Sequence, residues 1–503
     1  MPLDKVLQIP ELLRIISQPL GKKDILQTAL GSHRFFHLLM PVLWETVCGA
    51  SQLFALIKGA EISQVTIVTV PYEIIRLPHV VNEEALVRLR LYGGFVKYII
   101  VFKSNHIKYE LLDWEALWIQ ARDQPLLPNL DSCSLSNDFF ISYPQLPWLT
   151  MFISPMLREL RVEGPDEVLP PSTPPRACYL AFRTLIEKCS TLSVLAIFPD
   201  EDMEYPGANV AAPGYYGDLN QRNEAYEFRS FFQHTGSLTS LKTTSFLLLQ
   251  DNILQLISGS DTLECLDIYQ GVRSEDLPFA TLPSDAFPAL RHLGFHHFFD
   301  DTTIRDFYRL LPEVTDGLVS LKIKYDSRRP NKERSKLTLI SSICQGSPYL
   351  TDLSLQLTSG FGGSTWEVPT EILQSLAVLP LRRLCITFAI IVGASLDTMS
   401  ALFPNLVSLK LPHHSIGLTE LHQFVERMPC LECIGIGLRL GGTALDVPNI
   451  PIVSHCSALR AIESDFKGEV GFDSRLVLYS QQSYQACRKF ARYVHMLLAR
   501  CFH

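Results

Sequence analysis

The stretch Leu318-Val-Ser-Leu321-Lys-Ile323 carries the pattern that decides the fold: an apolar residue, two others, an apolar residue, one other, and an apolar residue. From Leu241 to Ile462 the central apolar residue of this pattern recurs every 25 to 32 residues. Self-similarity on this scale is typical of stacked repeats. Further copies are Leu263-Glu-Cys-Leu266-Asp-Ile268, Leu290-Arg-His-Leu293-Gly-Phe295, Leu350-Thr-Asp-Leu353-Ser-Leu355, Leu381-Arg-Arg-Leu384-Cys-Ile386, Leu406-Val-Ser-Leu409-Lys-Leu411 and Leu431-Glu-Cys-Ile434-Gly-Ile436.

Each copy of the pattern alternates as a β-strand does. Successive side chains of a strand point to opposite faces, so Leu266 and Ile268 would point into a core while Asp267 and Tyr269 would point away from it. The segments between the copies have helical spacing, for example over residues 418–428. A strand followed by a helix, about every 28 residues, predicts a right-handed α/β solenoid whose outward strand residues form one continuous surface.

The pattern resembles the leucine-rich-repeat family in its longer, cysteine-containing form. The turns Cys189-Ser-Thr-Leu192 and Cys456-Ser-Ala-Leu459 match the family's return from helix to strand. The resemblance implies a horseshoe over residues 51–465, with loops inserted at 164–175 and 199–229. These loops are either variable surface or part of a binding rim. Residues 466–503 would follow as a C-terminal cap, because their apolar spacing predicts an amphipathic helix that covers the last repeat or binds a partner.

The first fifty residues lack this pattern and carry the signals of three short helices. Pro10 can open the first helix, and Gly21 can close it. Asp24 suits the first turn of the second helix, where a negative charge is favourable. Three short helices in about forty residues bury little surface by themselves, so such a module needs a partner or a neighbouring domain.

This N-terminal segment resembles an F-box in its Ile9-Pro10-Glu11-Leu12-Leu13 opening, its Asp24-Ile25-Leu26 stretch and its closing Pro41-Val-Leu-Trp44. The resemblance implies an F-box domain at residues 1–50 that binds a Skp-family adaptor. About half of the matching apolar residues could instead form the module's own core, and Trp44 and Val47 would dock the module onto the first repeat. The adaptor-binding residues implied are Ile9, Pro10, Leu12, Leu13, Ile16, Leu20, Ile25, Leu26, Leu30 and Phe35.

Composition restricts the class of protein. A chain that is 47% hydrophobic and 19% charged folds, and a net charge of −8 argues against a general nucleic-acid binder. The longest uncharged apolar run, Leu384–Leu396, is too short to span a bilayer, and the first residues are too charged for a signal peptide. The 12 cysteines lack the spacing of a disulfide framework. We therefore expect a cytoplasmic or nuclear protein with neither a membrane nor a nucleic acid as its partner.

No motif for catalysis or for a cofactor stands out. Cys430-Leu-Glu-Cys433 lacks the second pair that a structural zinc site requires, and the pairs His296-His297 and His413-His414 fit turn positions after strands. We therefore expect no metal, no cofactor and no enzymatic activity. Seven bases between Lys322 and Lys336 leave two interpretations open: a solvated rim loop, or a site for an acidic or phosphorylated partner.

Together these features predict the substrate-recognition subunit of a cullin-type (SCF) ubiquitin ligase, in which other subunits perform the catalysis. The alternative is a repeat scaffold with a degenerate F-box that binds its partner without recruiting a ligase. Co-purification with a Skp adaptor distinguishes the two. The sequence does not identify the target protein, but strand alternation predicts the residues that would face it: Asp267, Tyr269, His292, His296, Lys322, Lys324, Gln356 and Lys410.

Overall fold

The computed structural model describes most of the chain in two compact units. Unit 1 comprises Met1–Leu263 and Gly271–Glu275, and unit 2 comprises Glu264–Gln270 and Asp276–His503. The residues that the structure describes are 10–17, 19–67, 69–104, 107–135, 146–163, 173–199, 228–270, 277–298, 302–327, 333–359, 366–387, 389–392, 396–417, 420–421, 426–439, 461–463 and 466–467.

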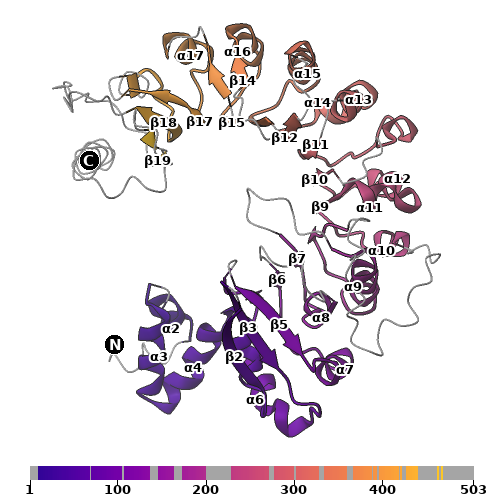
Figure 1. Cartoon of the computed structure of the whole chain (residues 1–503), viewed down its shortest axis with the longest axis vertical. Helices are drawn as coiled ribbons and strands as arrows, with labels where there is room; N and C mark the ends of the chain where they lie inside the picture. The colour runs from indigo at the N-terminus through magenta and orange to yellow at the C-terminus, as the bar shows by residue number, and fades with distance from the viewer. Residues whose placement is uncertain are drawn as a thin grey trace, which may run out of the picture. The chain divides into compact units, whose positions relative to one another are not determined.

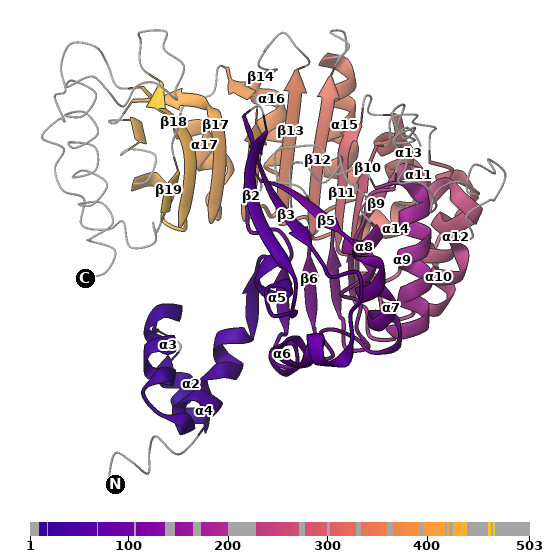
Figure 2. The same ribbon diagram turned by 60° about the horizontal axis from the view of Figure 1, so that its bottom comes forward.

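Unit 1 begins with three helices, α2 (Pro10–Ser17), α3 (Lys22–Leu30) and α4 (His33–Trp44), which pack together (Figure 2). The Ser32 side chain begins α4 by accepting a hydrogen bond of 3.2 Å from the Phe35 backbone N–H, because the first turn of a helix leaves such donors without partners. The small core of the three helices consists of Leu13, Ile25, Ala29 and Leu39.

A run of short parallel strands follows in unit 1. Its neighbours, in order, are β1 (Thr46–Cys48), β4 (Tyr98–Ile100), β6 (Ser132–Ser134), β7 (Glu159–Arg161), β8 (Val194–Ala196) and β9 (Ser240–Thr244). The helical elements of this part are α5 (Ser51–Phe54), α6 (Glu83–Gly93), α7 (Glu115–Asp123), α8 (Leu146–Thr150), α9 (Pro175–Lys188), α10 (Arg229–His234), α11 (Ser245–Leu249), η3 (Gln250–Asn252) and α12 (Ile253–Ser258).

Unit 1 also contains a separate three-stranded sheet, in the order β2 (Glu61–Ile67), β3 (Val70–Arg76) and β5 (Lys108–Leu112). β2 pairs antiparallel with β3, whereas β3 and β5 are parallel. Every residue of β2 is exposed, so this strand lacks the buried face that alternation would reveal in the sequence.

Unit 2 contains a second run of parallel strands, with α13, α15, α16 and α17 along one side of it (Figure 1). Its neighbours, in order, are β10 (Cys265–Tyr269), β11 (His292–Phe298), β12 (Ser320–Ser327), β13 (Asp352–Ser359), β15 (Arg383–Thr387), β17 (Ser408–Ile416), β18 (Cys433–Arg439) and β19 (Ala461–Glu463). β20 (Phe466–Lys467) also pairs with β18. β14 (Trp366–Val368) and β16 (Ala389–Ile391) form a small parallel pair. The helical elements are η4 (Phe279–Thr281), α13 (Thr302–Leu310), α14 (Pro312–Asp316), α15 (Glu333–Gly346), α16 (Thr370–Leu376) and α17 (Leu396–Leu402).

The register of unit 2 aligns the apolar residues of the sequence pattern in two buried rows, because parallel neighbours present the same face at the same depth. The first row is Leu266, Leu293, Leu321, Leu353, Leu384, Leu409 and Ile434. The second row is Ile268, Phe295, Ile323, Leu355 and Ile386. All of these side chains are buried.

The expected fold class is wrong. We expected an α/β class of one particular kind, a right-handed leucine-rich-repeat solenoid preceded by an F-box and closed by a cap, whereas the structure shows parallel β-sheet with helices in each unit and a separate three-stranded sheet. The sheet of β2, β3 and β5 includes an antiparallel pair that the expected class lacks. The physical reason is that the pattern specifies only short strands with a buried face. Strands of parallel sheets in other α/β folds also need a buried apolar face, so the pattern does not distinguish between these folds.

Several expectations fall outside the described residues. These are most of the inserted loops, at 164–172 and 200–227, and the C-terminal helix after residue 467. The predicted domain boundaries therefore stay predictions. Within the described ranges, none of the helices combines the length and the apolar character needed to cross a lipid bilayer.

Candidate protein-binding surfaces

The three N-terminal helices expose an unusual number of large apolar side chains. Ile15 is 60% exposed, Ile16 49%, Leu20 40%, Leu26 43% and Leu30 70%. Large apolar side chains that a folded protein leaves exposed can mark interaction sites. These five side chains, here called the apolar helix surface, remain exposed because the short helices carry more apolar residues than their small core can cover.

The structure places the predicted adaptor-binding residues in several different settings. Leu13 and Ile25 belong to the core of the three helices, and Phe35 packs against that core. Leu12 is half-buried. Ile9 lies outside the described residues, and Pro10 begins α2. Exposed on the surface are Ile16, Leu20, Leu26 and Leu30.

Ile15 belongs to the apolar helix surface although the sequence interpretation did not include it. The available signal was that α2 reads Leu12-Leu13 and then Ile15-Ile16. Such spacing places apolar residues around more of the helix than the single stripe that a core needs.

Trp44 and Val47 join the helices to the strands of unit 1. The Trp44 ring stacks on Tyr92 of α6, with ring centroids 4.9 Å apart and planes at 25°. Val47 is buried in β1 and lies in register with Ile99 of β4. Trp44 and Val47 are therefore engaged at this junction, whereas the side chains of the apolar helix surface on α2 and α3 remain exposed.

The strands of unit 2 carry polar residues in two rows between the buried ones, here called the strand face. The first row is Asp267, Gly294, Lys322, Ser354, Cys385 and Lys410. The second is Tyr269, His296, Lys324, Gln356 and Thr387. Seven of the eight predicted target-facing residues thus lie in two adjacent rows, and exposed His292 lies in the row before them.

Two side chains of this surface are buried: Lys324 is only 9% exposed, and His296 is fully buried. The surroundings of His296 explain its burial. Its Nε2 atom lies 3.1 Å from Asp267 Oδ1, and its ring stacks on Tyr269 at 4.2 Å with an angle of 6°. Gly294 makes room for the pair, since a Cβ there would stand 1.8 Å from Asp267 Oδ1. A glycine at this position is therefore a packing requirement.

Burial controls the charge of His296. Desolvation lowers the pKa of His296, Asp267 opposes that shift, and Lys322 and Lys324 add to it. The imidazole is consequently neutral at pH 7. Its Nδ1 atom is buried without a hydrogen-bond partner in the described part of the chain. The contact between Asp267 and His296 therefore serves the packing of the strand face, and the buried imidazole is not accessible as a base.

Cys385 lies in the first row between Ser354 and Lys410. Burial raises the pKa of its thiol, while a hydrogen bond from Ser354 and the charges of Lys410 and Lys322 partly oppose the rise. The thiol is therefore protonated at neutral pH, and a protonated thiol is a poor nucleophile. The strand face thus has the chemistry of a binding surface, with lysines at both sides of small residues.

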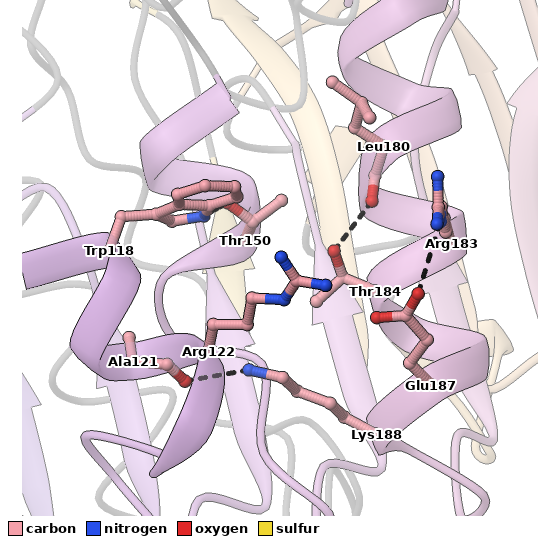
Figure 3. A pocket seen from close by; sticks show the side chains of 9 residues that line it. All are labelled: Trp118, Ala121, Arg122, Thr150, Leu180, Arg183, Thr184, Glu187 and Lys188. Atoms are coloured by element: carbon pink, nitrogen blue, oxygen red, sulfur yellow. Dashed lines mark hydrogen bonds and ion pairs between the residues drawn. The ribbon is translucent and has the colours of Figure 1, made fainter. Parts of the chain in front are cut away.

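A small pocket lies on the helical side of unit 1, between α7, α8 and α9 (Figure 3). It encloses about 170 Å³. Most of its polar groups are engaged with one another: the Trp118 indole N–H donates to Thr150, the Lys188 ammonium donates to the Ala121 carbonyl oxygen, and Arg183 pairs with Glu187. The pocket is mainly a packing crevice that joins neighbouring helices.

No family model and no curated protein matches this chain. Among solved structures, a chain of the crystal structure of the Rad7 and Elc1 complex in yeast is similar, with a TM-score of 0.39 and 15% sequence identity. The alignment covers 73% of this chain and 80% of that chain. The likeness is too low to support a conclusion about function, which therefore depends on the two surfaces.

Proposed function

We propose that this chain is the target-recognition subunit of a cullin-type ubiquitin ligase. In this function the apolar helix surface binds a Skp-family adaptor, and the strand face of unit 2 binds the target protein. The observation that carries the proposal is the group of five large apolar side chains that α2, α3 and the turn between them leave exposed. Four of the five, all except Ile15, are positions at which the F-box resemblance places adaptor contacts.

Burial of this surface would supply the binding energy. Covering an apolar side chain of this size contributes about 1.5–3 kcal/mol, and only part of it appears as affinity, because association costs translational and rotational freedom. Exposed helices with such side chains suit a partner whose groove takes up an apolar face. A constitutive complex would also remove the exposed apolar area from water, which favours solubility.

The strand face would hold the target protein close to the catalytic subunits of the ligase. Its lysines and neutral side chains can contact a target, while transfer of ubiquitin would occur in other subunits of the ligase. A bound target then reaches the catalytic subunit at a raised effective concentration. We place the protein in the cytoplasm or nucleus, where such ligases act.

The test is co-purification of the full-length chain with a recombinant Skp-family adaptor. Leu26→Asp and Leu30→Asp each place a charge in the apolar helix surface, so we expect loss of the complex with little change in folding. Leu91→Asp is the matched control, because Leu91 is an equally exposed leucine, 57%, on α6. We expect this variant to bind as the wild type does.

Two outcomes would contradict the proposal. A wild-type chain that forms no complex with the adaptor at micromolar concentration has no ligase-recruiting surface. An effect of Leu91→Asp as large as that of Leu26→Asp would show that the losses come from unfolding.

A further inference from the structure

Two exposed histidines lie one turn apart at the start of α4. His33 and His37 point their rings toward each other, with ring centroids 4.4 Å apart. Their two Nε2 atoms are separated by 3.2 Å. Neither side chain contributes to the core of the three helices, so packing does not explain why these rings converge.

The chemistry of two converging imidazole nitrogens allows two states. One ring can donate its Nε2–H to the other as a hydrogen bond. If both rings carry their proton on Nδ1, each Nε2 atom has a free lone pair, and these two atoms lie 3.2 Å apart. Neutral imidazole nitrogen is the commonest metal ligand in proteins. The second state needs only a change of tautomer.

The distance suits a metal ion. Zinc–nitrogen bonds measure about 2.0–2.1 Å, and two such bonds to atoms 3.2 Å apart enclose an angle of about 100°. That value is close to the tetrahedral angle of about 109° that zinc adopts. Histidines four residues apart on one helix are also the arrangement by which zinc-binding helices hold their ion.

We propose that His33 and His37 form a two-histidine binding site for a borderline transition-metal ion such as Zn²⁺ or Ni²⁺. In the described residues no group of three or more potential ligands comes together, so water or a side chain of another molecule completes the coordination. Both rings are exposed, which leaves those positions accessible. The ion would link the first two turns of α4, directly after the Ser32 cap.

The test uses Ni²⁺, because imidazole is a preferred ligand of this ion. Titration calorimetry of the full-length chain should show one site that His33→Ala and His37→Ala each weaken by roughly tenfold or more, since each removes half of the protein ligands. Cu²⁺ added to the same proteins should give an electron paramagnetic resonance spectrum with coupling to two imidazole nitrogens. That coupling distinguishes this site from the thiols of the chain.

His234→Ala is the matched control, because His234 is also an exposed helical histidine but has a hydrogen bond to the Ser230 carbonyl oxygen. We expect it to bind Ni²⁺ as the wild type does. The inference is overturned if the wild type binds no ion, or if the double variant His33→Ala/His37→Ala binds as tightly as the wild type. Circular dichroism in the presence of a chelator should show the same helix content in every variant, because both side chains are exposed.

Discussion

The apolar helix surface and the strand face differ in where they place their apolar residues. On α2 and α3, leucines and isoleucines remain exposed around a core of a few side chains. On β10 to β13, the corresponding residues are buried in two rows, and polar residues take the outward positions between them. A partner of the helices would therefore gain free energy by removing apolar side chains from water, whereas a partner of the strands would meet mainly polar side chains.

The difference also concerns stability. In the strand rows an apolar side chain stabilises the chain itself, but on the helices it remains available to stabilise a complex. The following variants separate these two uses, and they begin with the largest expected effect.

Leu321→Ala and Leu26→Ala remove the same atoms from the two regions. Leu321 is fully buried between Leu293 and Leu353, so its truncation should lower the free energy of unfolding by about 2–5 kcal/mol through the cavity that it leaves. Leu26 is 43% exposed, so Leu26→Ala should cost less than about 0.5 kcal/mol. Urea denaturation followed by circular dichroism measures both. Similar losses would show that Leu26 is part of the core.

Gly294→Ala tests whether the strand face needs its internal packing. The added Cβ would collide with Asp267 Oδ1 and His296 Nε2, so we expect a loss of about 1–3 kcal/mol in the free energy of unfolding. Gly236→Ala is the control, because no atom lies within 4 Å of a Cβ at that glycine. A loss at Gly294 no greater than the loss at Gly236 would mean that the Asp267–His296 contact is easily rearranged.

His296 should make the stability of unit 2 sensitive to acid. Its pKa in the folded chain is lowered from the ordinary value of 6.5, so below that pH the unfolded chain binds a proton more readily. This contribution to stability is therefore present above pH 6.5 and is lost as the pH falls toward the folded-state pKa. The slope for one proton is at most about 1.4 kcal/mol per pH unit.

Thermal melts of the wild type and of His296→Phe, recorded from about pH 8 to pH 5, provide the measurement. The variant should lose part of the decline in melting temperature on the acid side. His292→Gln should keep the whole decline, because His292 is exposed in the neighbouring row. An identical acid profile in His296→Phe would assign the decline to other groups.

The sequence predicted the buried rows of unit 2 well, because spacing alone determines which side of a short strand is apolar. It also predicted the N-terminal helices from Pro10, Gly21 and Asp24. The fold class could not be predicted from the sequence. β2 is exposed along its whole length and has no alternation that would reveal the sheet of β2, β3 and β5. Strand patterns also do not specify the connections that distinguish one α/β fold from another.

The strand face was predictable in position but not in detail. Alternation places His296 outward, yet its ring is buried against Asp267 and Tyr269 because Gly294 leaves space beside it. That outcome depends on side chains of two strands, which one strand's pattern cannot show. The His33–His37 pair, in contrast, follows from a spacing of four within a helix and could have been found in the sequence.

The pairing of strands in unit 2 has a consequence for folding during synthesis. From β11 to β19, each strand pairs with the strand before it in the run, so Leu293 meets Leu266 and Leu321 meets Leu293. Contacts between segments so close in the chain form rapidly, because little loop entropy is lost. As the chain leaves the ribosome at about 5–20 residues per second, each new strand finds its neighbour within seconds. Unit 2 can therefore grow from its first strand while the rest is still being made.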